Sequence, residues 1–178
     1  MKTREMAFIA MLAAFLCVLA PFSVPAGVIP ITLATFAVYV AAAVSGKREG
    51  TIAVILYILI GGIGVPVFSG FTGGFQKIAG VTGGYLVGFI PCAFLTGWLI
   101  DRHEKRKWIY PLAMAAGTLV CYALGTAWYC VLTKTGLSAA LTMCVVPFLA
   151  ADAVKIAAAS AVSVPLRPRI RRIIGKGR

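Results

Sequence analysis

Two oppositely charged side chains, Asp152 and Lys155, lie in the otherwise apolar stretch of residues 148–159. Their spacing of three residues places both on one face of a helix. A charge at the centre of a bilayer costs about 2.5–3.5 kcal/mol on insertion scales, so such a face turns toward other helices rather than toward lipid. Two interpretations follow: the pair only neutralises itself, or it meets a solute inside the protein.

Pro147 divides the long apolar region of residues 137–166 and places this pair close to a helix start. Proline is tolerated in the first turn of a helix but disrupts a helix interior. We therefore expect a half-helix over residues 137–146 and a spanning helix over residues 147–166, although one kinked helix would fit the same pattern. In the first arrangement the charged pair lies in the first two turns, where a solute from outside could reach it.

A glycine-rich and aromatic loop at residues 66–80 is a second candidate for ligand contacts. Glycines permit tight turns and the close approach of a ligand, while phenylalanines could form apolar walls and polar side chains could form hydrogen bonds. The candidates are Phe68, Phe71, Gly73, Gly74, Phe75 and Gln76, followed by Tyr85 after the loop. The alternative is a flexible surface loop, with Tyr85 as an anchor at the membrane interface.

Sequence motifs of enzymes are missing from the chain. No G-x-x-x-x-G-K-S/T phosphate loop occurs, and neither does an H-E-x-x-H or a G-x-S-x-G motif. We therefore expect neither an enzyme nor a cofactor or metal site, and any ATP hydrolysis must come from other chains. The net charge of +12 does not predict nucleic-acid binding, because the cations lie in short clusters between apolar runs.

The elements that position these residues are predicted by six apolar runs. The chain is 61% hydrophobic and only 12% charged, whereas about a quarter of the residues of a soluble domain are charged. We expect an all-α integral membrane protein, formed as one domain over residues 1–178. The predicted helices span residues 6–24, 31–45, 51–65, 81–100, 108–132 and 147–166. Four of them have about the 20 residues that a membrane crossing needs, whereas the runs over residues 31–45 and 51–65 are shorter.

The distribution of lysine and arginine predicts the orientation of these helices. Of the 17 such residues, only Lys77 and Lys134 fall in one set of connections, and Lys155 falls within a predicted helix. The others lie at the two termini and in the connections near residues 47 and 102–107. Because cytoplasmic loops carry the excess of positive charge, we expect both termini to be cytoplasmic. On the first predicted helix, Ala10 and Ala14 form a small-xxx-small step that favours close helix contact.

Four stretches together resemble the BioY type of biotin-specific substrate-binding (S) components of energy-coupling-factor (ECF) transporters. They are residues 29–35 (IPITLAT), 64–70 (GVPVFSG), 80–89 (GVTGGYLVGF) and 147–155 (PFLAADAVK). With the six-run layout, the resemblance covers nearly the whole chain. Two positions depart from the family pattern: Val81 stands where proline is usual, and Ala34 where glutamine is frequent. Neither departure touches Asp152 or Lys155.

The resemblance implies a helical bundle that binds biotin near its outer face, in the cell membrane of a prokaryote. It also implies docking onto a transmembrane coupling protein served by two ATPase subunits, through small residues of the first helix, here Ala10 and Ala14. For biotin we expect Asp152 to accept a ureido N–H and Lys155 to bind an oxygen of the ligand. Further expected polar contacts are Thr32, Thr35, Gln76 and Tyr85, and Phe68, Phe71 and Phe75 are expected to form a lid.

Three other functions fit the same residues. An S component for another vitamin would share the architecture and differ in the pocket. A stand-alone secondary transporter, proton-coupled through Asp152, would work without ATPase partners, although the internal repeats frequent in such proteins are not evident in this chain. A structural or assembly protein of the membrane would bind no small ligand.

Overall fold

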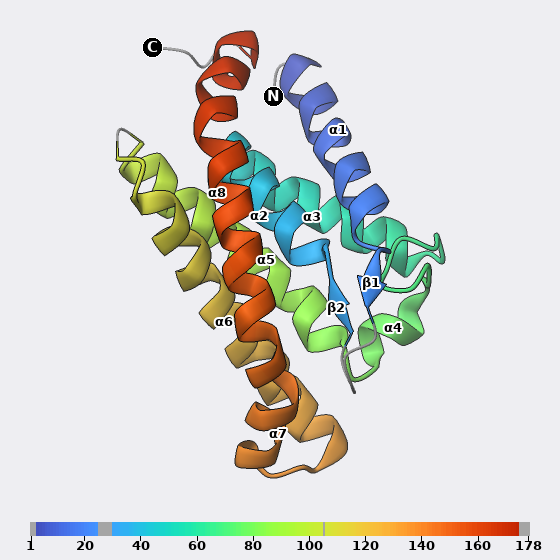
Figure 1. The fold of residues 1–178 in the computed structure, drawn as a ribbon. Coiled ribbons are helices and arrows are strands. Elements are labelled where there is room, and N and C mark those ends of the chain that lie inside the picture. The colour runs from blue at the N-terminus through green and yellow to red at the C-terminus, as the bar shows by residue number, and fades with distance from the viewer. Residues whose placement is uncertain (1–2, 25–29, 105, 175–178) are drawn as a thin grey trace.

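The computed structural model describes residues 3–24, 30–104 and 106–174, most of them helical (Figure 1). The helices are α1 (Thr3–Leu19), α2 (Ala34–Ser45), α3 (Lys47–Gly62), α4 (Phe75–Ala79), α5 (Gly83–Arg102), α6 (Ile109–Thr133), α7 (Leu137–Cys144) and α8 (Val146–Ile174). Strands β1 (Ser23–Val24) and β2 (Ile31–Thr32) form a short antiparallel pair. The start of α1 and the end of α8 lie at one end of the molecule, and α7 lies at the opposite end (Figure 1).

Among the described residues, three helices are long and apolar enough to cross a membrane, namely α5, α6 and α8. A fourth apolar helix, α2, is shorter. A helix that is apolar on every side is buried either among other helices or in lipid, and α2 is buried among other helices. Accordingly, every residue of α2 from Ala37 to Ser45 is buried, and the helix packs against α1, α3, α5 and α8. The helical membrane architecture expected from the composition is confirmed at this level.

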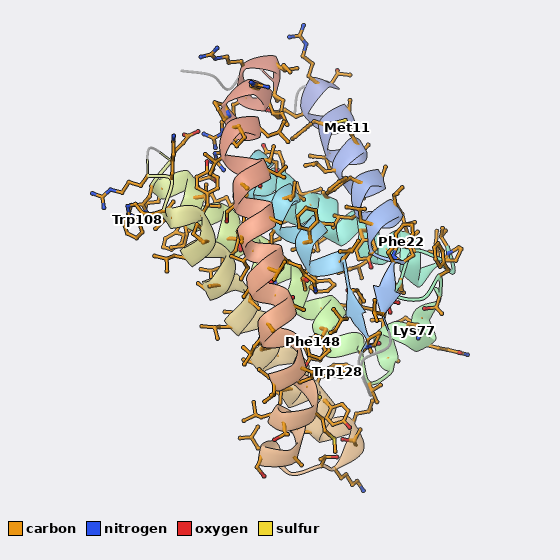
Figure 2. All side chains as sticks on the ribbon, in the orientation of Figure 1. Met11, Phe22, Lys77, Trp108, Trp128 and Phe148 are labelled. Atoms are coloured by element: carbon orange, nitrogen blue, oxygen red, sulfur yellow. The ribbon has the colours of Figure 1, made fainter. Side chains whose placement is uncertain are left out.

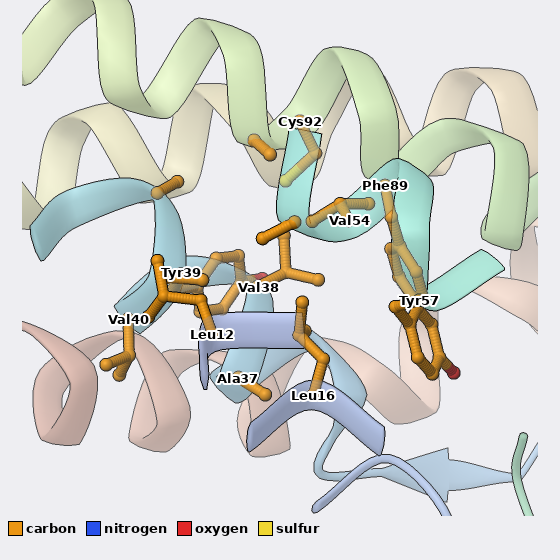
Figure 3. Packing of buried hydrophobic residues seen from close by; sticks show 14 of the residues in the cluster. Leu12, Leu16, Ala37, Val38, Tyr39, Val40, Val54, Tyr57, Phe89 and Cys92 are labelled. Atoms are coloured by element: carbon orange, nitrogen blue, oxygen red, sulfur yellow. The ribbon is translucent and has the colours of Figure 1, made fainter. Parts of the chain in front are cut away.

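The core around α2 combines branched, aromatic and very small side chains. Leu16 of α1, Tyr57 of α3 and Phe89 of α5 pack around Val38 and its neighbours on α2 (Figure 3). Small residues let the helix backbones come close, and Gly97 of α5 is the tightest example toward α3. A Cβ atom on Gly97 would lie 2.5 Å from the backbone nitrogen of Lys47 and 2.6 Å from its Cα atom.

We expect Gly97→Ala to lower the melting temperature of the purified protein. Backbone atoms of Lys47 occupy the space of the added methyl group, so α3 and α5 must separate, at a cost of about 1–3 kcal/mol for overpacking. Thermal unfolding in detergent measures the effect. Gly136→Ala is the matched control, because a Cβ atom there meets nothing within 4 Å. Equal melting temperatures for the Gly97 variant and the parent protein would contradict this packing.

Three predicted helix boundaries near the N-terminus are wrong. The first helix ends at Leu19 rather than at residue 24, because Pro21 lacks the N–H that would continue it. Ser23 and Val24 instead pair with Thr32 and Ile31, so the second helix begins at Ala34 and not at residue 31. The third helix begins at Lys47 rather than at residue 51. The backbone N–H of Lys47, which has no partner within the first turn of its helix, donates instead to Asp101 Oδ2 on α5 at 2.9 Å.

The last two helices follow the predicted division at Pro147, but α8 is longer than expected. The half-helix predicted over residues 137–146 is confirmed as α7, and α8 starts at Val146. The predicted end of α8 at residue 166 is wrong, because the helix continues through Pro165 and Pro168 to Ile174. The predicted loop at residues 66–80 also contains a short helix, α4, beside an isolated bridge between Phe68 and Thr72.

Candidate ligand-binding site

A cavity of about 360 Å³ lies between α2, α5, α6 and α8, with contributions from α3, α4 and β2. This volume is within the roughly 300–1,000 Å³ of small-molecule sites. Figure 2 labels two of its lining residues, Phe148 on α8 and Lys77 on α4. The other aromatic and aliphatic walls are Tyr39, Tyr57, Phe68, Val81, Tyr85, Leu86, Phe89 and Tyr122.

A buried hydrogen-bond network occupies one side of this cavity. The Lys155 ammonium donates to Asp152 Oδ1 at 2.9 Å and to the Thr35 hydroxyl oxygen at 3.1 Å. The Thr35 hydroxyl donates to the same Asp152 oxygen at 3.2 Å, and the Tyr122 hydroxyl donates to Asp152 Oδ2 at 2.5 Å. Asp152 and Lys155 are 3% and 9% exposed. Helices α2, α6 and α8 therefore meet at a single carboxylate.

The charges of Asp152 and Lys155 neutralise each other, and both residues also line the cavity. The two opposite charges form an ion pair, as the simpler interpretation of their spacing requires. A carboxylate has about four lone-pair sites and an ammonium has three donors. Oδ2 of Asp152, which accepts from Tyr122, and the Lys155 ammonium each retain capacity for a further hydrogen bond. The arrangement can thus bind a neutral polar group that both donates and accepts.

The structure brings six of the predicted ligand contacts to the cavity: Thr32, Thr35, Phe68, Tyr85, Asp152 and Lys155. The hydroxyl groups of two of them, Thr32 and Tyr85, also form hydrogen bonds with the backbone. The Thr32 hydroxyl oxygen accepts the N–H of Ala34 at 3.2 Å at the start of α2. The Tyr85 hydroxyl donates to the carbonyl oxygen of Cys144 at 3.2 Å and so connects α5 to the end of α7.

The other five predicted contacts, Phe71, Gly73, Gly74, Phe75 and Gln76, lie in the same loop region but do not line the cavity. Phe71 and Phe75 are 61% and 72% exposed, and the Phe71 ring packs edge-on against Phe22 at a centroid distance of 5.7 Å. Of the three phenylalanines expected to form a lid, only Phe68 contributes a wall in this structure. The roles given to the other two stay predictions.

Sequence analysis missed the tyrosines and the threonine that complete the site. Tyr122 and Thr118 lie one turn apart on α6, and the Thr118 hydroxyl is 2.6 Å from that of Tyr39 on α2. The spacing of four residues between two hydroxyl side chains in an apolar run was the available signal. It is a weak signal, because hydroxyl groups in membrane helices also bond to their own backbone, as Thr118 does with the Met114 carbonyl at 2.8 Å.

The predicted docking residues lie on a different surface. Ala10 and Ala14 are both exposed on α1, on the same helix as the exposed Met6, Met11 and Val18. Met11 is labelled in Figure 2 on the outer side of α1. This helix therefore presents both small and large apolar residues away from the core. Its small residues, Ala10 and Ala14, permit the close approach of another helix.

Comparisons with known proteins agree on one family. The model of the BioY family matches residues 1–172. The biotin transporter BioY of Thermotoga maritima is 37% identical over 92% of this chain and 96% of its own length. The biotin transporter BioY2 of Lactococcus lactis subsp. cremoris is 34% identical over 86% of this chain and 85% of its own. The crystal structure of an S component for biotin from an ECF-type ABC transporter superimposes with a TM-score of 0.86, at 23% identity over 94% of each chain.

Proposed function

The chain belongs to the BioY family, and from that premise we propose that it is the biotin-binding, substrate-capture subunit of an ECF-type transporter. It is a multi-pass membrane protein of a transporter family rather than an enzyme. The observation that carries the proposal is the buried network of Asp152, Lys155, Thr35 and Tyr122, which lines a cavity of about 360 Å³ with otherwise mostly apolar walls.

The chemistry of biotin matches this cavity. Its bicyclic body is largely apolar, while its ureido group carries N–H donors and a carbonyl acceptor, and a buried site must pair each of these polar groups. Asp152 accepts a ureido N–H, and Lys155 donates to a ligand oxygen. Thr32, Thr35 and Tyr85 supply further polar contacts from the cavity wall. Gln76, Gly73, Gly74, Phe71 and Phe75 approach the ligand only if their loop moves inward when it binds.

The assembly is part of the same proposal. The bundle crosses the cell membrane of a prokaryote six times, with both termini and the basic clusters on the cytoplasmic side, and the cavity faces outward. The exposed Ala10 and Ala14 of α1 dock onto a transmembrane coupling protein. Because this chain has no phosphate loop, two separate ATPase subunits hydrolyse the ATP that drives transport. The position of the start of α1 and the end of α8 at one end of the molecule supports this orientation (Figure 1).

We expect biotin to raise the melting temperature of the detergent-purified protein, whereas riboflavin and thiamine leave it unchanged. A ligand that binds only the folded state adds RT ln(1 + [L]/Kd) to the stability, about 2.7 kcal/mol at a hundredfold excess over Kd. Thermal unfolding at micromolar ligand measures the shift. If another vitamin raises the melting temperature and biotin does not, that vitamin is the ligand. If no vitamin changes the melting temperature of a well-folded sample, the proposal is overturned.

A further inference from the structure

The charges that line the cavity do not cancel. Among the described residues that line it, one is acidic, Asp152, and two are basic, Lys155 and Lys77. The tyrosines and cysteines of the lining are neutral near pH 7, because their ordinary pKa values lie above it. Asp152 and Lys155 form an ion pair at 2.9 Å, so the charge that remains is the single positive charge of Lys77.

Lys77 differs from Lys155 in its surroundings. Lys155 is 9% exposed and already donates to Asp152 and Thr35. Lys77 is half-buried on α4, and its backbone N–H donates to the Gly74 carbonyl oxygen. Within the described residues, its ammonium group makes no hydrogen bond or ion pair. The ammonium of a half-buried lysine without a protein partner is hydrated by water. A carboxylate that enters the cavity can replace this water with a charge-assisted hydrogen bond.

We propose that the cavity selects a ligand with one negative charge, and that Lys77 binds the carboxylate of that ligand. This inference rests on the proposed function and assigns an orientation to biotin within it. The ureido ring lies at the neutral network of Asp152, Lys155 and Tyr122, while the carboxylate at the end of the aliphatic chain lies at α4 beside Lys77. Lys77 is therefore a specificity-determining residue, which separates the free acid from amides and esters of the same compound.

The test compares biotin with biotinamide, in which a neutral amide replaces the carboxylate. Isothermal titration calorimetry on the purified full-length protein measures both affinities. We expect the parent protein to prefer biotin, and Lys77→Met to weaken biotin binding about five- to tenfold, as for a charge-assisted hydrogen bond at a half-buried site. The affinity of Lys77→Met for biotinamide should stay within twofold of the parent value. Lys77→Arg, which keeps the charge, should retain the preference for biotin.

Lys134→Met is the matched control, because it removes an exposed cation that does not line the cavity. It should leave both affinities unchanged, which separates a local contact from a general effect of net charge. If Lys77→Met weakens both ligands equally, or neither, the inference is overturned while the proposed function stands. If the parent protein binds neither ligand, the proposed function fails and this inference fails with it.

Discussion

Replacing Asp152 by asparagine should lower the affinity for biotin about thirtyfold or more. The carboxylate accepts from Lys155, Thr35 and Tyr122, and an uncharged amide cannot balance the Lys155 ammonium in a site that is 3% to 9% exposed. Removal of one partner from a buried, hydrogen-bonded charge pair costs about 2–5 kcal/mol in binding. Calorimetric titration of biotin into the purified variant measures the loss.

A double variant separates loss of the ligand contact from loss of the fold. Lys155→Met alone should weaken binding and also lower the melting temperature, because it leaves Asp152 charged and unpaired. In Asp152→Asn combined with Lys155→Met, no lone charge stays buried, so the melting temperature should recover toward that of the parent protein while biotin binding stays weak. A biotin affinity within about threefold of the parent value in either single variant would contradict the assignment of this pair.

Replacing Arg167 by methionine should destabilise the fold at the end of the molecule opposite α7. The Arg167 side chain is 1% exposed and donates to Asp101 Oδ1 at 2.6 Å, to Glu104 Oε1 at 3.4 Å and to the carbonyl oxygen of Ala43. It thus joins α8 to the end of α5 and to α2. Loss of one member of a buried ion pair costs about 3–5 kcal/mol, and we expect about 3 kcal/mol because Glu104 is 44% exposed.

Arg169→Met is the matched control for that variant. Arg169 lies two residues away on α8 and is exposed, so its replacement should change the melting temperature little, as for most surface substitutions. The affinity of Arg167→Met for biotin, measured well below its melting temperature, should stay close to the parent value, since Arg167 does not line the cavity. A melting temperature of Arg167→Met equal to that of Arg169→Met would show that the cluster does not stabilise the fold.

The extension of α8 illustrates where prediction from sequence failed. Pro165, Pro168 and the basic residues after them are typical of a helix end. The helix nevertheless continues to Ile174, because Arg167 and Arg171 both reach Asp101 Oδ1 at 2.6 Å on another helix. No local pattern contains that information, since the partners are separated by 66 and 70 positions in the chain.

Elements with a strong local signal were predicted closely. Helix α6 covers Ile109–Thr133, against a prediction of 108–132, because a long apolar run between charged segments is stable only as a helix in lipid. Strands β1 and β2 were missed, since two residues each are too few to show an alternating pattern. The short helix α4 was missed for a similar reason, as its five residues lie in a glycine-rich loop.

The amino-acid sequence alone was sufficient for the membrane class, the approximate helices and the placement of Asp152 and Lys155 on one inward-facing side of a helix. Each of these depends on hydropathy, charge and spacing along a few turns of one helix. The cavity depended on tertiary structure. Its central carboxylate is completed by Thr35, 117 positions away, and by Tyr122, 30 positions away. Hydroxyl groups on separate helices become one site only when packing brings α2, α6 and α8 together.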